Sequence, residues 1–235
     1  MDPTKNKIAI DARLRSSAEV APPLLVEELT FAYGNLQVLS GLSLRLQVGD
    51  LALLSGPNGA GKTTLLNCLT GLLRAREGRV SIGGHDLWKD EQSAKRELAF
   101  VPDVPRFYTE LTAWEHLRFV ALAHGMGDGY AGEAERLLRD FGLWEVRDLY
   151  PHHYSRGMRL KLGIVMALLR PFHVLLLDEP TSALDAEGVE TLLSVLQESS
   201  AGGAAVLMST HDASLGARLS SPRLLRLEQG HLVEG

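Results

Sequence analysis

The 235-residue chain is 45% hydrophobic and 23% charged, which is typical of a globular protein with one large domain or two small ones. A net charge of −5 and the lack of any basic run argue against a nucleic-acid-binding protein, because such proteins depend on cationic side chains. The single cysteine, Cys68, excludes an intramolecular disulfide and suits a reducing compartment, and its leucine neighbours predict a buried thiol on a helix.

The first 23 residues have no apolar segment of the kind found in signal peptides, and they end in the stiff pair Pro22-Pro23. We therefore expect residues 1–23 to form a tail outside the fold. The longest apolar stretches, such as 162–169, are far shorter than the ~18 residues that a membrane-spanning helix needs. The sequence therefore predicts no membrane span.

Short segments that are continuously apolar, or that alternate apolar and polar residues, predict β-strands. In chain order they cover residues 24–33, 42–48, 50–55, 79–82, 98–101, 173–180 and 204–210. The last part of the chain, 223–235, has two such runs around Gln229-Gly230 and predicts a hairpin.

Segments with apolar residues at helical spacing alternate with these strands. Thr112 and Glu115 form a capping-box pattern that opens a helix ending near His124, and Pro171 ends a later helix. The expected helices cover residues 112–124, 134–141, 160–168 and 189–196. Alternating strands and helices predict an α/β parallel sheet, and the purely helical stretch from about 107 to 170 predicts a subdomain inserted between its strands.

Residues 56–63 fit the pattern G-x-x-x-x-G-K-[ST] between an expected strand and an expected helix. Glycines let the backbone approach phosphates closely and direct several N–H groups at them, and the following helix adds the positive end of its dipole. Lys62 would place its charge on the β- and γ-phosphates, and the Thr63 hydroxyl can bind Mg²⁺. The predicted nucleoside triphosphate site consists of Gly56, Pro57, Asn58, Gly59, Ala60, Gly61, Lys62, Thr63 and Thr64.

A second element, VLLLDEP at 174–180, ends an apolar strand with two carboxylates, Asp178 and Glu179. Such a strand delivers its terminal residues to the carboxyl edge of the sheet, where the phosphate loop also opens. Asp178 can hold Mg²⁺, directly or through water, and Glu179 can act as general base on the attacking water. The alternative is that the two acids only cap the turn after the strand, and the nearby phosphate loop disfavours it.

With these motifs the chain resembles the nucleotide-binding domains of ABC transporters, over residues 24–235. Tyr33 in FAYG matches the aromatic residue that stacks on adenine in that family, although a strand aromatic can also simply fill the core. YSRGM at 154–158 lies at the place of the family's signature, SALD at 182–185 at that of its D-loop, and STH ends in His211, the place of its switch histidine. The resemblance implies an α/β P-loop NTPase fold of the ABC type, with a mostly parallel sheet core, antiparallel N-terminal strands and an inserted helical subdomain.

The resemblance also implies ATP hydrolysis with Mg²⁺ in a head-to-tail dimer of identical or different ATPase subunits. Each ATP would contact the P-loop of one subunit and the signature of the other. The catalytic residues implied are Glu179 and His211. The metal ligands implied are Thr63, Asp103 and Asp178. The nucleotide contacts implied outside the P-loop are Tyr33, Ser155, Gly157 and Asp185.

The chain departs from the family's usual pattern in two motifs. In the signature, Arg156 replaces the first of two adjacent glycines and Met158 replaces the glutamine. Asp103 stands where the family usually has a glutamine after the strand that precedes the helical subdomain, and a carboxylate there can still bind Mg²⁺. Since Ser155 and Gly157 remain, we expect a usable site. Both departures resemble export-type systems with separate membrane subunits.

The resemblance implies a membrane-spanning partner on a separate chain, a place at the cytoplasmic face of the membrane and no nucleic-acid partner. The groove for the partner would lie between the sheet and the 107–150 region. Candidates for its lining are Phe107, Tyr108, Trp114 and Trp144, of which we expect at least two in the subdomain core instead. Two alternatives remain open: a soluble ABC-type ATPase in protein or iron–sulfur assembly, and another P-loop enzyme such as a small-molecule kinase. The kinase does not explain YSRGM, SALD and STH in that order.

Overall fold

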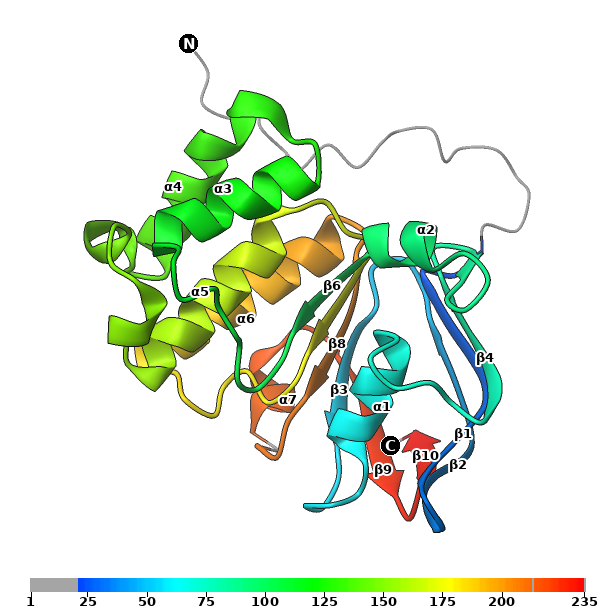
Figure 1. Cartoon of the computed structure of the whole chain (residues 1–235). Coiled ribbons are helices and arrows are strands. Elements are labelled where there is room, and N and C mark those ends of the chain that lie inside the picture. Colours follow the sequence, from blue (N-terminus) through cyan, green and yellow to red (C-terminus); the bar gives the residue numbers. More distant parts are fainter. Residues whose placement is uncertain (1–20, 213, 235) are drawn as a thin grey trace.

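The computed structural model describes residues 21–212 and 214–234, so the expected tail lies outside the described part except for its last three residues. Figure 1 shows two β-sheets and a group of helices beside them. The strands are β1 (Leu24–Tyr33), β2 (Leu36–Leu46), β3 (Leu51–Ser55), β4 (Glu77–Ile82), β5 (His85–Asp86), β6 (Leu98–Val101), β7 (Val174–Leu177), β8 (Ala205–Ser209), β9 (Arg223–Glu228) and β10 (His231–Glu234). The α-helices are α1 (Lys62–Leu69), α2 (Glu91–Arg96), α3 (Ala113–Ala123), α4 (Tyr130–Asp140), α5 (Arg156–Leu169), α6 (Ala186–Ala201) and α7 (Leu215–Arg218).

The larger sheet has six strands in the order β10-β9-β3-β8-β7-β6. Its ladders are parallel except for the terminal hairpin of β9 and β10, which is antiparallel. The smaller sheet has the order β2-β1-β4-β5 and is antiparallel throughout. A mostly parallel core with antiparallel N-terminal strands was expected from the sequence, and it is confirmed.

Residues of the inner strands alternate between two hydrophobic cores, because successive side chains of a strand point to opposite faces. In β3, Leu51 and Leu53 face a core formed with α3 to α6, whereas Ala52 and Leu54 face a core formed with α1 and the smaller sheet. The strands β7 and β8 divide their residues in the same way. Both faces are covered, which explains why these strands are apolar at nearly every position.

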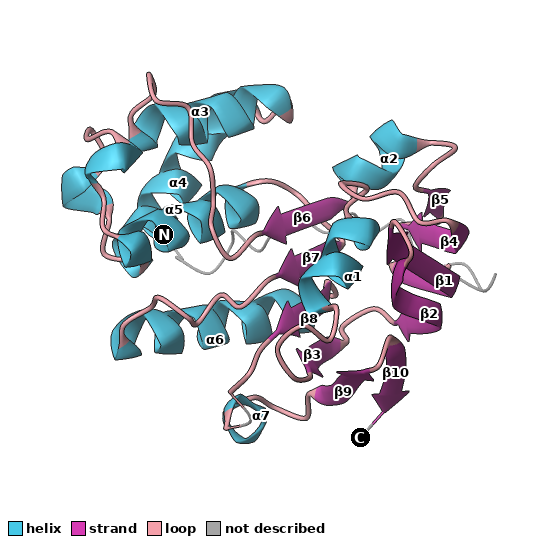
Figure 2. Ribbon diagram, turned by 60° about the horizontal axis from the view of Figure 1, so that its bottom comes forward, coloured by secondary structure: helices cyan, strands magenta, loops and turns pink. Residues whose placement is uncertain are grey.

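The helix α1 lies between the two sheets (Figure 2). Its buried face includes Leu65, Leu66 and Cys68, which are fully buried. The expectation of a buried thiol on a helix is therefore confirmed, and burial raises the pKa of the Cys68 thiol to about 12.

All the elements between β6 and β7 are helical, and we continue to interpret them as an inserted subdomain. The capping box of α3 is formed: the Thr112 hydroxyl accepts from the Glu115 N–H, and the Glu115 carboxylate accepts from the Thr112 N–H. Trp114 and Trp144 are partly buried against the helical core and contact each other edge to face, with ring centroids 5.8 Å apart. These two aromatic residues therefore belong to the core, whereas Tyr108 is 57% exposed.

The strand β2 differs from the expected strand at 42–48, and that expectation is wrong at both ends. It begins at Leu36 because it pairs with β1 along almost its whole length, from Tyr33 onward. Gly34, with φ of +56°, starts the tight turn between them. Register shifts along this ladder disturb the two-residue alternation on which the sequence interpretation relied. The short elements β5, α2 and α7 were not expected at all.

His116 on α3 gives the fold a pH-dependent stability. The side chain is 1% exposed, and its Nδ1–H donates to the Thr112 carbonyl at 2.7 Å while Nε2 accepts from the Tyr108 N–H at 2.9 Å. The ring is therefore neutral, and burial lowers its pKa from the usual value near 6.5. The unfolded chain binds a proton at a higher pH than the folded chain, so stability is complete above about pH 6.5 and is lost as the pH falls below it.

We expect the melting temperature to fall between pH 7.5 and pH 5.5, and to fall less in His116→Gln, because glutamine does not titrate. Scanning calorimetry of both proteins at a series of pH values measures this difference. Exposed His152 supplies the control, since His152→Gln should keep the pH dependence of the unchanged protein. Equal pH slopes in all three proteins would contradict this account of His116.

Candidate active site

Four parallel strands end next to one another at one edge of the larger sheet. The register pairs Leu54 of β3 with Ser209 of β8, Leu177 of β7 with Met208 of β8, and Val101 of β6 with Leu177. The segments that leave these strand ends therefore start side by side. They carry the glycine loop, the two adjacent acids, the expected switch histidine and the carboxylate that replaces the family's usual glutamine.

The glycine loop between β3 and α1 needs its glycines for two reasons. A Cβ on Gly56 would lie 2.4 Å from the Leu227 carbonyl oxygen, and a Cβ on Gly61 would lie 2.9 Å from Cγ1 of Val38. Gly61 also has φ of +104°, and Gly59 has φ of +78°. The loop thus lies close against the backbone of β9 and the side chains of β2, with a path that only glycine allows.

The start of α1 fits an anion. Gly61 precedes the helix, and among the described residues no side chain caps its first turn and no acid lies in that turn. The free N–H groups and the helix dipole there favour a negatively charged ligand such as a phosphate chain. Pro57, Asn58 and Gly59 are exposed at the mouth of the loop, and Thr63 is exposed in the first turn. Ala60 is partly buried and Thr64 is buried, so both support the loop from within.

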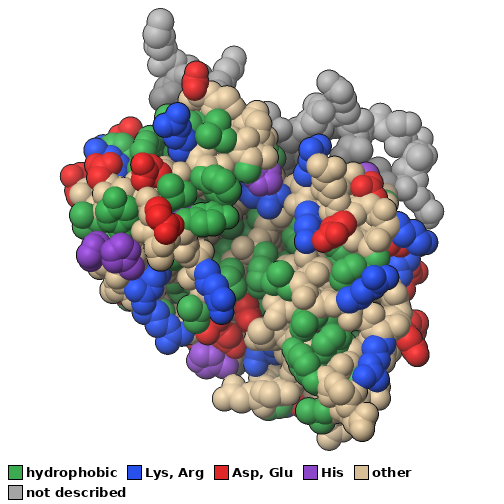
Figure 3. Space-filling view, in the orientation of Figure 1, with side chains coloured by type: hydrophobic (Ala, Val, Ile, Leu, Met, Phe, Trp, Pro, Cys, Tyr) green, Lys and Arg blue, Asp and Glu red, His purple; other side chains and the backbone are tan. Residues whose placement is uncertain are grey.

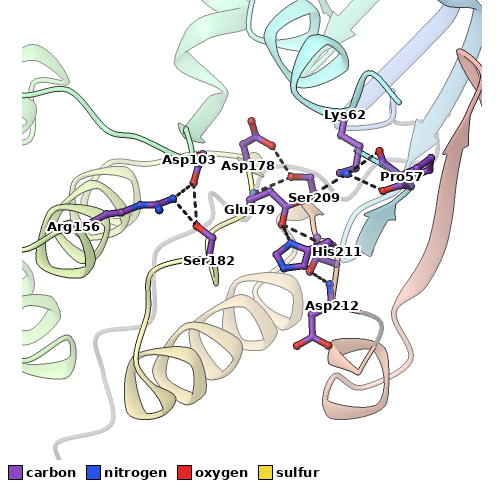
Figure 4. A network of polar contacts seen from close by, with 12 residues as sticks. Pro57, Lys62, Asp103, Arg156, Asp178, Glu179, Ser182, Ser209, His211 and Asp212 are labelled. Atoms are coloured by element: carbon purple, nitrogen blue, oxygen red, sulfur yellow. Dashed lines mark hydrogen bonds and ion pairs between the residues drawn. The ribbon is translucent and has the colours of Figure 1, made fainter. Parts of the chain in front are cut away.

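Lys62 is held inside the loop by oxygen atoms. Its side chain is only 8% exposed, and Nζ donates to the Gly56 carbonyl at 2.9 Å and to the Pro57 carbonyl at 3.5 Å. The same Nζ lies 3.7 Å from Oε1 of Glu179. The ammonium group therefore already occupies the space between the loop and the acidic residues (Figure 4).

Asp178 and Glu179 are tied together through Ser209 at the end of β8. The Ser209 hydroxyl donates to Oδ1 of Asp178 at 2.6 Å and accepts from the Glu179 N–H at 2.9 Å. Asp178 is 3% exposed, so its carboxylate is almost fully enclosed by protein and is oriented by the bond from Ser209. Ser209 is not among the residues predicted for the site, because the STH motif points only to its histidine and the serine lies about 30 positions from the acids that it bonds.

His211 bonds to the second acid. Its N–H and its Nδ1 lie 3.3 Å and 2.8 Å from Oε2 of Glu179. A carboxylate can only accept, so Nδ1 carries the proton, and the bond orients the ring. Glu179 also has φ of +46°, a conformation that costs a non-glycine residue energy and is found mostly at functional sites.

Candidate metal ligands are few in this region. No group of three or more His, Cys, Asp and Glu side chains suited to a metal ion occurs within 21–212 and 214–234. A Mg²⁺ ion needs only one or two protein ligands when it also binds phosphate oxygens and water. The Asp178 carboxylate and the exposed Thr63 hydroxyl offer the oxygen atoms that Mg²⁺ prefers, so they are the candidates for these protein ligands.

Tyr33 is available for a ligand. It ends β1 with its ring 50% exposed, in edge-to-face contact with Phe31 at 4.9 Å between centroids. Phe31, which is 7% exposed, fills the core instead. The alternative in which Tyr33 packs into the core therefore does not hold.

The signature segment lies away from the glycine loop of its own chain. Arg156, the first residue of α5, and Lys62 stand on opposite sides of the two acids in Figure 4. Ser155 is exposed and caps α5 by accepting from the Met158 N–H at 3.1 Å. Gly157 has no space for a side chain, since a Cβ would lie 2.6 Å from the Ala183 carbonyl oxygen. The structure thus does not bring Ser155 and Gly157 to the loop.

Asp103 and Asp185 are also engaged outside the loop. Oδ1 of Asp103 accepts from Arg156 at 3.1 Å and from the Ser182 hydroxyl at 3.0 Å, so the carboxylate points toward the signature segment (Figure 4). Asp185 caps α6 and lies 2.9 Å from Nζ of Lys161. The bond from Lys161 and the N-cap bond lower the pKa of Asp185.

Comparison with known proteins agrees with this geometry. Residues 39–182 match the ABC transporter family. The ABC-type transporter ATP-binding protein EcsA of Bacillus subtilis is 33% identical over 80% of this chain and 76% of its own length. The cobalt import ATP-binding protein CbiO of Rhodobacter capsulatus is 36% identical over 92% of this chain and 79% of its own length.

A solved structure described as the ATP-binding subunit of an ABC transporter superposes with a TM-score of 0.86. It is 34% identical in sequence and covers 90% of this chain and 89% of its own. The glycine loop, the paired acids and the fold therefore have one explanation. The chain belongs to the ABC transporter family, as an ATP-binding subunit that hydrolyses ATP with Mg²⁺.

Proposed function

We propose that the chain powers a membrane transporter whose membrane-spanning part is a separate chain. In this proposal two ATPase chains, identical or different, close head to tail around two ATP molecules. The observation that carries it is the separation of Lys62 from Arg156 by the acidic residues (Figure 4). This separation supports an arrangement in which ATP on the glycine loop contacts the Ser155 end of α5 of the second subunit. The D-loop residue Asp185 would lie at the same interface.

The proposed site divides the ligand among several elements. The backbone of residues 56–61 and the start of α1 surround the phosphates, with Lys62 on the β- and γ-phosphates and Thr64 supporting the loop. Tyr33 stacks on the adenine ring. Thr63 and Asp178 hold Mg²⁺, which neutralises charge on the phosphate oxygens.

Glu179 is the proposed general base. Its carboxylate would accept a proton from the attacking water, and His211, oriented by that carboxylate, would contact the γ-phosphate. The 2.8 Å bond between His211 and Glu179 and the 3.7 Å approach of Lys62 hold the carboxylate at the mouth of the loop. Ser209 is a positioning residue, because it bonds the Glu179 N–H and the Asp178 carboxylate with a single hydroxyl.

The proposed docking site for the membrane partner is a groove between the sheet and the helices. Its lining combines apolar and cationic side chains: Phe100, Pro102, Pro105, Arg106, Phe107, Val120, His124, Gly163, Met166, Ala167 and Arg170. Burial and the charge of Arg170 lower the pKa of His124, so that ring favours its neutral form. Nε of Arg170 is buried and has no partner among the described residues. Hydrophobic side chains also gather over α3 beside the groove (Figure 3).

This groove suits a short helix with apolar side chains and a carboxylate, which would pair with Arg106 or Arg170. No helix of the described residues is long and apolar enough to cross a membrane. We place the chain at the cytoplasmic face of the membrane, where ATP is supplied. Export is the proposed direction, on the resemblance of Asp103 and Arg156 to export-type systems. One relative is named for cobalt import, so the family includes importers as well.

We expect Glu179→Gln to bind ATP, to lose about 100-fold or more of its turnover, and to form a stable dimer at saturating Mg-ATP. Lys62→Ala in the same background should stay monomeric, because the phosphates lose their charged partner. Light scattering after size-exclusion chromatography, with and without Mg-ATP, measures both. A monomeric Glu179→Gln protein at saturating Mg-ATP, or one with full activity, would contradict the proposal.

We expect Ser209→Ala to lower kcat about tenfold, since the loss of a hydrogen bond to a charged group costs on the order of 1.5 kcal/mol. The Kd for ATP should change little, because Ser209 bonds the acids rather than the glycine loop. Steady-state hydrolysis and a binding titration separate these two effects. Ser199 is also a buried serine, but it lies on α6, away from the acids. Ser199→Ala is therefore the matched control and should leave kcat unchanged.

We expect Arg106→Glu to abolish co-purification with the membrane subunit while the isolated chain keeps its ATPase rate, because the reversed charge repels a carboxylate in the groove. Lys89→Glu introduces the same change at a side chain that is 84% exposed and outside the groove, and should still co-purify. Affinity capture from detergent-solubilised membranes, followed by mass spectrometry, gives the comparison. Equal recovery of the membrane subunit with both variants would exclude the groove.

A further inference from the structure

We propose that Asp103 and Arg156, the two departures from the family's usual motifs, act together as an ion pair that positions the Ser155 end of α5. This inference rests on the proposed function, since the Ser155 end is the half-site that meets the nucleotide of the other subunit. Asp103 then serves as the partner of Arg156 rather than as a metal ligand. Both are positioning residues.

The pair joins segments that are distant in the sequence. Asp103 follows β6, Arg156 begins α5, and Ser182 lies in the segment between β7 and α6. Arg156 Nη2 donates to Oδ1 of Asp103 at 3.1 Å and to the Ser182 hydroxyl at 3.3 Å, and Ser182 donates to the same Oδ1 at 3.0 Å. One carboxylate oxygen therefore holds three segments together at the edge of the site (Figure 4).

Two contacts fix α5 to the segment before α6 and leave its other side to Asp103. Gly157 packs so closely on Ala183 that no side chain fits, and Lys161 bonds to Asp185 at 2.9 Å. The helix and residues 182–185 thus form one packed unit. On the side of β6, the polar contact between Asp103 and the first turn of α5 is made by Arg156.

The charges explain why the two departures belong together. An arginine beside Ser155 without a counter-ion would pull on any nearby phosphate, and an aspartate beside Asp178 and Glu179 without one would add to a negative site. When the two side chains pair, their opposite charges cancel. Their side chains are 59% and 41% exposed, so the bond is weak in stability terms and can break and re-form as subunits close.

A double-mutant cycle tests the coupling. Asp103→Asn, Arg156→Gln and the double variant are made in the Glu179→Gln background, and the Mg-ATP concentration for half-maximal dimerisation is measured. Each single variant should require about two- to fivefold more Mg-ATP, the factor that exposed ion pairs give. The double variant should be no worse than either single one. Exchange of the two charges, Asp103→Arg with Arg156→Asp, should restore dimerisation in part.

Three further readouts separate positioning from general damage. ATP binding by the monomer, at protein concentrations below dimerisation, should be equal in all variants, because the glycine loop is untouched. The coupling should fade at about 1 M salt, where the screening length is about 3 Å. Glu135→Gln breaks the Glu135–Arg139 pair on α4, whose side chains are 43% and 54% exposed, and is the matched control with no effect on dimerisation.

Additive effects of Asp103→Asn and Arg156→Gln, or a coupling that persists unchanged at high salt, would overturn the inference. A Glu179→Gln parent that stays monomeric would overturn the proposed function instead. In that case the same cycle in steady-state ATPase assays of the otherwise unchanged chain still decides the pair: non-additive losses of kcat support it, and additive losses refute it.

Discussion

The register of the parallel ladders is the constraint on which the active site depends. The strands β3, β7 and β8 are buried on both faces, and their alternate residues belong to two different cores. A shift of one residue would exchange every side chain between these cores, so the register is strongly fixed. Because the register fixes the strand ends, it also brings the glycine loop, the paired acids and His211 to the same edge of the sheet.

At that edge the acids are preorganised by their own surroundings. The left-handed backbone of Glu179 is kept by the bond from its N–H to Ser209, and its carboxylate is kept by His211 and approached by Lys62. The strain of one residue is thus balanced by a network of neighbours, as is common where a side chain must be aimed. The two acids share a serine yet face different surroundings, since Asp178 is buried and Glu179 faces the loop.

The sequence predicted what local pattern can encode. The strand at 24–33, the capping box at Thr112 and the glycine loop depend on residues within a few positions of one another, and each is found where expected. The start of β2 was missed because the bulged ladder with β1 hides its alternation. Ser209 and the pairing of Asp103 with Arg156 could not be foreseen, because the bonded residues lie about 30 and 53 positions apart and meet only through the sheet.

The bonds from Lys62 to the carbonyl groups of Gly56 and Pro57 have a consequence for the rate of nucleotide capture. These bonds join the ammonium group to the loop backbone and help to hold the loop in its wrapped shape. A phosphate chain that binds Lys62 adds charged oxygens to its carbonyl partners and to the Glu179 carboxylate 3.7 Å away, and it meets a loop that is already ordered. The loop therefore loses little conformational entropy when ATP binds. We expect the association rate constant for ATP to approach the diffusion limit, because no loop has to fold first.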